Sequence, residues 1–182
     1  ANYFNPDRIQ FGALRVLNDD TIAPGMGFGT HPHNNMEIIT IPLEGALEHK
    51  DSMANVGIIE ADEIQVMSAG TGVSHSEYNK NKDLAVSLLQ IWILPKAQNV
   101  TPRYDQKNIK ELKKVNELYP VVTPDPKAKG MWIHQDAWFH MGDFDKATEL
   151  EYRIHKKGNG VYAFLIEGAV EIDGENLEKR DA

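Results

Sequence analysis

The chain has 182 residues, of which 41% are hydrophobic, and this is enough to form a packed core in one large domain or two small ones. It contains no cysteine, so we expect no disulfides and no zinc–thiolate site. It has no apolar run near ~18 residues, so we expect no membrane span, and the lack of a secretory leader pattern leads us to expect a cytoplasmic location. The net charge of −8 argues against general electrostatic binding to nucleic acid or to anionic lipid.

Short alternating runs bounded by Gly, Asn and Asp dominate the first half of the chain. We predict strands at residues 36–43, 46–49, 56–59, 64–67 and 84–94. Glu44-Gly45 and residues 52–55 are candidate turns between them. Many short strands at this spacing predict an all-β fold, an antiparallel sandwich or barrel.

The second half is less regular. Apolar residues at every third position predict a helix over residues 107–118, and three prolines between 120 and 126 then predict an extended linker. Further strands are predicted at residues 131–134, 150–154 and 161–167.

A weak internal repeat links the two halves. Residues 41–48 and 163–171 each contain a predicted strand, a Glu-Gly turn and a second strand, as a duplicated β-unit would. The second copy has only His155 upstream of it, without a partner two residues away, and a closed second barrel would need more strands than the remaining chain supplies.

Two short runs contain metal-competent side chains spaced two residues apart. These are His31 and His33 in the first run, and His75 and Glu77 in the second. Because side chains alternate along a strand, each pair would point to one face, and two such strands could present three imidazoles and a carboxylate to one point. One pair alone would fit two surface histidines equally well, but two pairs predict a divalent transition-metal site with open positions for substrate or O₂.

The other candidate ligands are assigned different roles. Glu37 has the same strand parity as His31 and His33, and we expect it to be a structural carboxylate or one that supports the site rather than a ligand. His49 has no partner at ligand spacing and is predicted to be a hydrogen-bonded surface histidine. No second metal site is expected from His134, His140 and His155.

Longer segments around these residues resemble one family. They are Gly25–His33 followed by Met36-Glu37, then Glu44–Ser52, Gln65–Glu77, and Leu89–Trp92 with Thr101–Tyr104. Together they resemble bacterial members of the pirin family, within the cupin superfamily.

The resemblance implies a bicupin, in which two β-barrels face each other and the N-terminal one holds a single metal through His31, His33, His75 and Glu77. Iron is a frequent metal in the family, and Cu, Ni, Zn, Mn and Co are alternatives. We therefore expect residues 1–118 to form the metal-binding barrel, residues 119–127 a linker, and residues 128–182 a partial, metal-free second barrel.

The chain departs from the family pattern at three places. Ala1–Phe4 matches an internal family position and the chain ends within the second domain, so we expect a fragment or only the ordered part of a longer protein. Asp62 stands where the family usually has glycine, so that turn is expected to differ slightly.

Two functions from different classes fit these features. The resemblance implies a quercetin 2,3-dioxygenase, in which a flavonol binds through its 3-hydroxyl and 4-carbonyl oxygens, Glu77 is the general base, and O₂ is the second substrate. The alternative is an iron-dependent sensor or co-regulator that binds a protein partner without turnover, as animal relatives do. A third possibility is a cupin that has lost its chemistry; quercetin turnover and metal loading distinguish the three.

Overall fold

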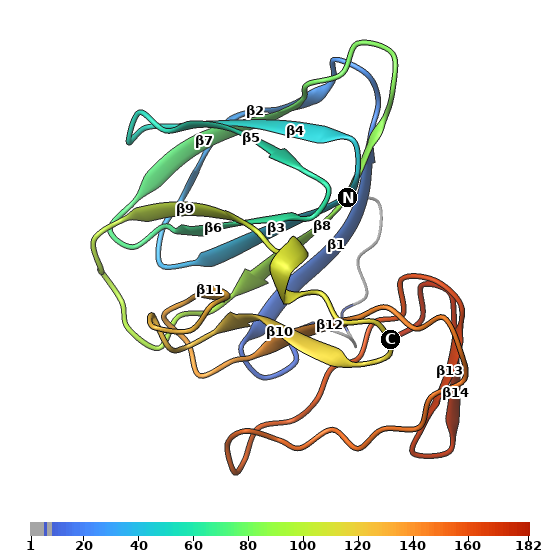
Figure 1. Cartoon of the computed structure of the whole chain (residues 1–182). Helices are drawn as coiled ribbons and strands as arrows, with labels where there is room; N and C mark the ends of the chain where they lie inside the picture. The colour runs from blue at the N-terminus through green and yellow to red at the C-terminus, as the bar shows by residue number, and fades with distance from the viewer. Residues whose placement is uncertain (1–5, 7–8) are drawn as a thin grey trace. The chain divides into compact units, whose positions relative to one another are not determined.

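A computed structural model of the chain describes residues 6 and 9–182, so the predicted family match at Ala1–Phe4 lies outside the described residues. The described chain divides into two compact units, one ending at Leu150 and the other spanning Glu151–Ala182. Strands dominate, and the all-β prediction is confirmed (Figure 1). Among the described residues, none of the helical segments has the length and apolar character that a membrane span requires.

Two antiparallel sheets form the main part of the first unit. The five-stranded sheet has the order β1 (Leu14–Ile22), β8 (Val86–Ile93), β3 (Glu37–Glu44), β6 (Glu63–Ser68), β9 (Arg103–Asn108). The four-stranded sheet has the order β2 (Gly27–His33), β7 (Val73–Asn79), β4 (Ala46–Asp51), β5 (Val56–Glu60). The two sheets appear as two layers in Figure 1.

The sheets pack face to face through a shared apolar core. One cluster of buried residues takes members from both sheets: Ile22, Leu47, Ile59, Val86 and Leu88. A second cluster of buried residues consists of Ile38, Met67 and Val73, with Met36, Met53 and Trp92 packed against it. β-Branched residues are frequent in these strands and suit a pleated, buried surface.

Strand β3 is buried on both faces, and the reason is a covering segment. Its residues from Glu37 to Pro42 are all buried, so the strand lacks the alternation of a sheet with one solvated face. Residues 118–142 contribute a small three-stranded sheet in the order β11 (Met131–Trp132), β10 (Leu118–Thr123), β12 (Phe139–Gly142). Hydrogen bonds from Arg103 to the Trp132 carbonyl and from Gln135 to the Leu94 carbonyl link this segment to the five-stranded sheet.

The helix predicted over residues 107–118 is wrong. Strand β9 continues to Asn108, and within the predicted helix only Lys110–Leu112 form a single 3₁₀ turn. Strand β10 starts at Leu118, the last residue of the predicted helix, and runs to Thr123 through part of the predicted linker. The apolar spacing does not correspond to one buried face, because Ile109 is buried whereas Val115 is 63% exposed. Pairing of Lys107 with Ile64 in the sheet outweighs the weak helical pattern.

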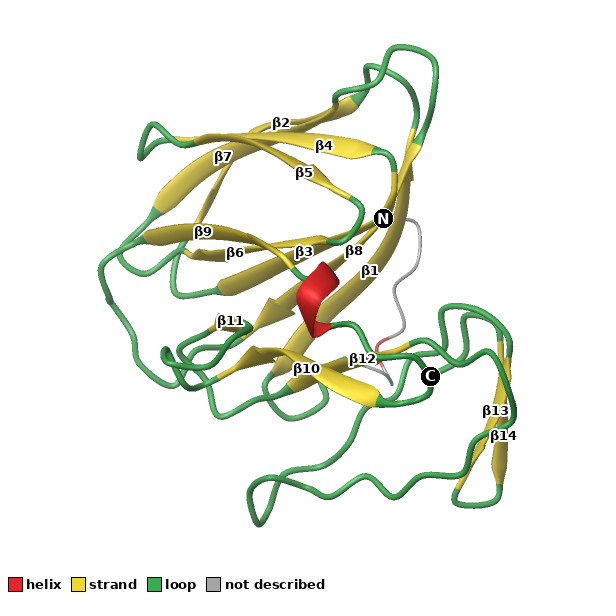
Figure 2. Ribbon diagram, viewed as in Figure 1, coloured by secondary structure: helices red, strands yellow, loops and turns green. Residues whose placement is uncertain are grey.

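The second unit contains one hairpin and no buried residue among residues 151–182. Its strands are β13 (Ala169–Ile172) and β14 (Glu175–Glu178), joined through Asp173 and Gly174, which both have positive φ as a tight hairpin turn requires. The strands predicted at 150–154 and 161–167 are wrong, since these segments are loops (Figure 2). Gly45 and Gly168 of the repeated Glu-Gly pairs both adopt positive φ, but the second copy lacks the strand predicted before its turn.

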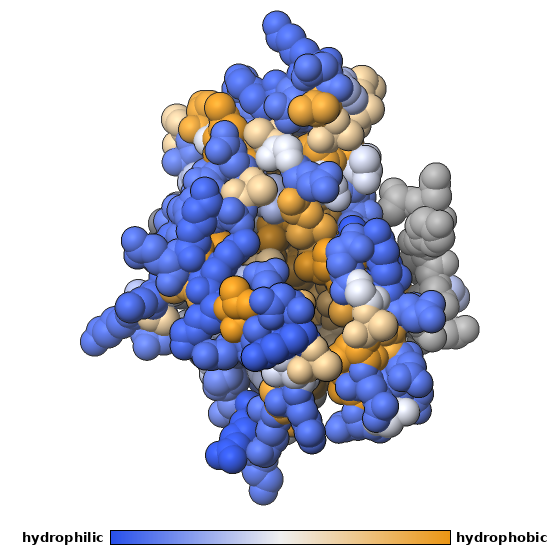
Figure 3. Space-filling model, turned by 45° about the vertical axis from the view of Figure 1, so that its right-hand side comes forward, coloured by the Kyte–Doolittle hydropathy of each residue, from blue (hydrophilic) through white to orange (hydrophobic). Residues whose placement is uncertain are grey.

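Polar side chains predominate on the face of the molecule that Figure 3 shows. In the space-filling view, hydrophilic side chains cover most of the visible face and apolar side chains form patches between them (Figure 3). Asp62, at the position where the family usually has glycine, adopts φ +69°, in the left-handed region that glycine reaches most easily.

Candidate metal centre

Three histidines predicted as ligands meet on the neighbouring strands β2 and β7. His31 lies directly opposite His75 in the strand register, and opposite residues of an antiparallel pair point to the same face. The ring centroids are 4.4 Å apart for His31 and His75, 4.9 Å for His31 and His33, and 5.0 Å for His33 and His75. One ligand nitrogen from each histidine lies within 4.8 Å of the others, which places three imidazoles around one point.

Hydrogen bonding leaves these rings ready to bind a cation. The Nδ1 of His31 is 2.8 Å from the Gly29 carbonyl, which can only accept, so Nδ1 donates and Nε2 of the neutral ring keeps its lone pair. The Nε2 atoms of His33 and His75 are buried and make no hydrogen bond. Buried polar atoms without a partner are costly, and a metal ion would satisfy all of them at once.

Burial also keeps two of these rings, those of His33 and His75, in the neutral form. Loss of solvation, reinforced by the neighbouring His31, lowers the pKa of His33 to about 4. The same causes, with burial the largest, lower the pKa of His75 to about 3. A neutral imidazole is the form that binds metals, so at neutral pH no proton has to leave these two rings.

Glu77, the fourth predicted ligand, is 1% exposed and lies on the same strand as His75. Its Oε2 accepts a hydrogen bond of 2.7 Å from Nε2 of Gln90, whose Oε1 accepts one of 3.2 Å from Nε1 of Trp92. Its Oε1 is buried without a hydrogen-bond partner, and burial raises the pKa of its carboxyl group. Gln90 thus orients the carboxylate through Oε2, and the side chain of Thr40 also interacts with it.

The four predicted ligands do not form one tight group. Within 4.8 Å, Glu77 groups with His49 and His75, whereas His31 and His33 group with His75. The two groups share His75, and the four-ligand set therefore stays a prediction. Neither group contains His134, His140 or His155.

The prediction that His49 is a surface histidine is wrong. Its side chain is completely buried, although it is hydrogen-bonded as expected, with Nε2 3.3 Å from Oδ2 of Asp51. Its position on β4 explains this, because His49 has the same parity as the buried core residue Leu47. The alternation along Ala46–Asp51 is a sequence signal that could have identified it.

Glu37 lies on β3, in the five-stranded sheet. It is 1% exposed, and its Oε2 accepts a hydrogen bond of 2.7 Å from Oγ of Ser68. Burial raises its pKa, while Ser68, the backbone of His134 and the charge of Arg103 oppose that rise. These contacts support a structural role, and Glu37 belongs to neither ligand group.

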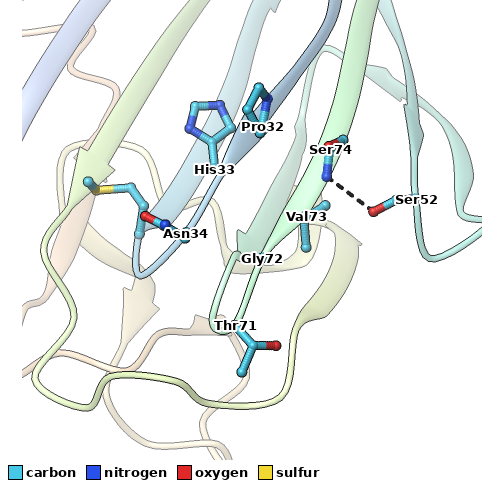
Figure 4. A pocket seen from close by; sticks show the side chains of 9 residues that line it. Pro32, His33, Asn34, Ser52, Thr71, Gly72, Val73 and Ser74 are labelled. Atoms are coloured by element: carbon cyan, nitrogen blue, oxygen red, sulfur yellow. Dashed lines mark hydrogen bonds between the residues drawn. The ribbon is translucent and has the colours of Figure 1, made fainter.

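Two cavities adjoin the histidines. One of about 200 Å³ is lined by Asn18, Asp20, Phe28, His31, Glu77, Gln90 and Trp92. The other, of about 460 Å³, lies beside His33 and is lined largely by residues 71–74 and their neighbours, where Oγ of Ser52 accepts a hydrogen bond from the backbone of Ser74 (Figure 4). The smaller cavity is thus lined by two aromatic side chains, Phe28 and Trp92, together with Glu77.

Comparison with known proteins identifies the family. The family model described as Pirin matches residues 1–93, and the one described as Quercetinase C-terminal cupin domain matches residues 120–182. Quercetin 2,3-dioxygenase of Escherichia coli (strain K12) is 41% identical over 181 residues, covering 100% of this chain and 77% of the relative. A pirin-like protein of Caulobacter vibrioides is 36% identical over 182 residues, covering 100% and 78%.

Solved structures give the same result. The crystal structure of the bacterial pirin YhhW from Escherichia coli in complex with nickel(II) superimposes with a TM-score of 0.82 at 39% identity, covering 99% of this chain and 76% of that one. Quercetin 2,3-dioxygenase from Acinetobacter baumannii has a TM-score of 0.58 at 25% identity, covering 70% and 51%. With these matches and a cluster of histidines able to hold one metal ion, the chain belongs to the pirin family of cupin proteins.

Proposed function

We propose that the chain is a metal-dependent dioxygenase of the quercetin 2,3-dioxygenase type. In this proposal His31, His33, His75 and Glu77 hold one divalent transition metal, with Fe(II) as the first candidate and Cu, Ni, Zn, Mn or Co as alternatives. The observation that carries it is the convergence of three imidazole rings. The Nε2 atoms of two of these rings, His33 and His75, are buried and have no hydrogen-bond partner. Relatives named quercetin 2,3-dioxygenase support the choice of reaction.

The cavity next to His31 suits a flat aromatic substrate. Phe28 and Trp92 line it, and aromatic side chains favour stacked or edge contacts with another ring. Asn18, Asp20 and Gln90 supply a few polar groups that could orient hydroxyl groups of a flavonol. The proposed binding partners are therefore a small aromatic molecule and O₂. We propose a cytoplasmic location for the protein.

Glu77 is the proposed general base. Its Oε1, buried and without a hydrogen bond, would take the proton of the substrate's 3-hydroxyl, while the bond from Gln90 holds Oε2 in place. Burial raises the pKa of Glu77 above that of an ordinary carboxyl group, which brings its basicity closer to that needed at neutral pH. A bound divalent metal would supply Lewis acidity that lowers the pKa of the hydroxyl group.

The test compares two buried carboxylates. Protein loaded with Fe(II), Ni(II) or Cu(II) is assayed for bound metal per chain, quercetin consumption and CO release under O₂. Glu77→Gln keeps an oxygen donor but loses basicity, so it should retain part of the metal and lose turnover by about 10²-fold or more. Glu37→Gln, which changes a carboxylate bonded to Ser68 outside the ligand groups, should keep its turnover.

Two results would change the assignment. If Glu77→Gln turns over like the parent, Glu77 is not the base and Glu37 becomes the next candidate. If the fully loaded parent never consumes a flavonol, the dioxygenase proposal is wrong, and the iron-dependent sensor or co-regulator with a protein partner takes its place.

A further inference from the structure

His49 lies between a predicted metal ligand and a carboxylate. Its Nδ1 is 3.4 Å from Nδ1 of His75, and its Nε2 is 3.3 Å from Oδ2 of Asp51. All three side chains come from adjacent strands, because Asp51 on β4 pairs with His75 on β7 in the register of the four-stranded sheet. The side chains of His49 and Asp51 are both completely buried, so water does not compete for these bonds.

The carboxylate of Asp51 at one end and the metal-facing nitrogen of His75 at the other both require the same direction of donation, from His75 through His49 to Asp51. A carboxylate only accepts, so Nε2 of His49 donates to Asp51, and a neutral His49 then has an accepting Nδ1. That nitrogen requires a donor, which fixes the proton of His75 on Nδ1. From the other end, a His75 that binds metal through Nε2 must also carry its proton on Nδ1, and its Nε2 is the buried atom without a partner.

The carboxylate end is held firmly. Oδ1 of Asp51 accepts backbone hydrogen bonds from Met53 at 2.9 Å and Asn55 at 3.0 Å, and Oδ2 accepts one of 2.8 Å from the Asn55 side chain. On the ring of His49, Tyr104 packs with its centroid 4.8 Å away and the planes tilted by 30°. Asp51 and His49 therefore have a fixed geometry before any metal arrives.

We propose that Asp51 and His49 are positioning residues, which fix the tautomer and the ring orientation of His75 so that its Nε2 lone pair faces the metal. The inference rests on the proposed metal site and adds a second layer to it. Partners of this kind, which hold the other nitrogen of a ligating histidine, commonly change metal affinity by roughly 10–100-fold when removed.

The competing interpretation makes His49 a ligand. Its ligand atom lies within 4.8 Å of those of His75 and Glu77, so distance alone would allow it. However, both of its ring nitrogens already have hydrogen-bond partners, and a neutral ring then has no lone pair left to bind a cation. The hydrogen bonds favour the positioning role.

The experiment measures Ni(II) affinity by competition with a chromophoric chelator, and the tautomer of His75 by ¹⁵N NMR in the metal-free protein at neutral pH. His49→Phe fills the space but removes the acceptor, and we expect Ni(II) affinity to fall 10–100-fold. His49→Asn offers an oxygen near the position of Nδ1 and should recover most of that loss. Tyr104→Phe keeps the ring stacked on His49 and should bind Ni(II) like the parent.

In the metal-free parent we expect His75 protonated on Nδ1, and in His49→Phe we expect this preference to be lost. Parent protein with the proton on Nε2, or His49→Phe with unchanged affinity, overturns the proposal. Complete loss of Ni(II) binding in both His49 variants also overturns it, because that result makes His49 a ligand. A parent that shows the expected tautomer but binds no Ni(II) refutes the proposed metal site and leaves the positioning chain intact.

Discussion

Acidification should destabilise the metal-free protein through His75. In the folded state burial lowers the pKa of His75 to about 3, whereas the unfolded chain has the ordinary value near 6.5. Below pH 6.5 the unfolded state therefore binds a proton that the folded state excludes, and stability falls with pH until about pH 3. From these two pKa values, the protonation of His75 alone lowers the free energy of unfolding by about 2 kcal/mol at pH 5 and by about 3 kcal/mol at pH 4, relative to neutral pH.

The assay is urea unfolding of chelator-treated protein, followed by tryptophan fluorescence at pH 7, 6 and 5. With a slope of about 2 kcal/mol per M urea, the His75 contribution lowers the midpoint by about 1 M between pH 7 and pH 5. Buried carboxyl groups with raised pKa, such as Glu37 and Glu77, act in the opposite direction, because the folded state binds their protons more readily. The parent alone therefore does not isolate His75.

His75→Gln isolates it, because glutamine does not titrate and the other groups remain. The difference in free energy of unfolding between parent and variant should shift by about 2 kcal/mol against the parent from pH 7 to pH 5. If this difference stays constant across that range, His75 is not held neutral by burial, and the argument that its ring is ready to bind metal at neutral pH is refuted.

Two further predictions concern the site and the loop that adjoins it. His31→Ala should lower the affinity for Ni(II) by more than the roughly 10–100-fold expected for removal of a hydrogen-bond partner of a ligand. His134→Ala, which lies outside both ligand groups, should retain Ni(II) through gel filtration followed by metal analysis. Equal Ni(II) retention by the two variants would exclude His31 as a ligand. Gly70→Ala should destabilise by at least about 1–3 kcal/mol in urea unfolding, because Gly70 has φ +46° and an added Cβ would collide with the Val100 carbonyl. Gly29→Ala has only a Tyr78 contact at 3.9 Å and should unfold like the parent, so a similar loss in both variants would refute the steric argument.

The sequence pattern is enough to find the three histidines and strands β3, β4, β5, β6 and β8, whereas β1 was not predicted. The spacing of His31 and His33 needs only the two-residue period of a strand to place both on one face. The same period marks His49 as buried, but its contact with His75 depends on the pairing of β4 with β7, which the spacing of residues along one strand does not reveal. The helix expected over residues 107–118 fails for the same reason, since β9 pairs with β6 over Glu63–Ser68 and extends that sheet to Asn108.

A feature of β2 that the sequence pattern does not reveal brings the two ligand pairs together. Phe28 pairs with Glu77 and His31 with His75, so β2 has one more residue than β7 between these pairs, and the register shifts by a bulge. Without that extra residue, His75 would lie opposite Thr30, and His31 and His33 would point to the other face of the sheet. The bulge also contains Gly29, whose carbonyl accepts the Nδ1 hydrogen of His31 and fixes its tautomer. One inserted residue therefore places Phe28, His31 and Glu77 around the same cavity and also orients the ring of His31. The two-residue spacing of the histidines is thus necessary for the site, but without the bulge it would not form the site.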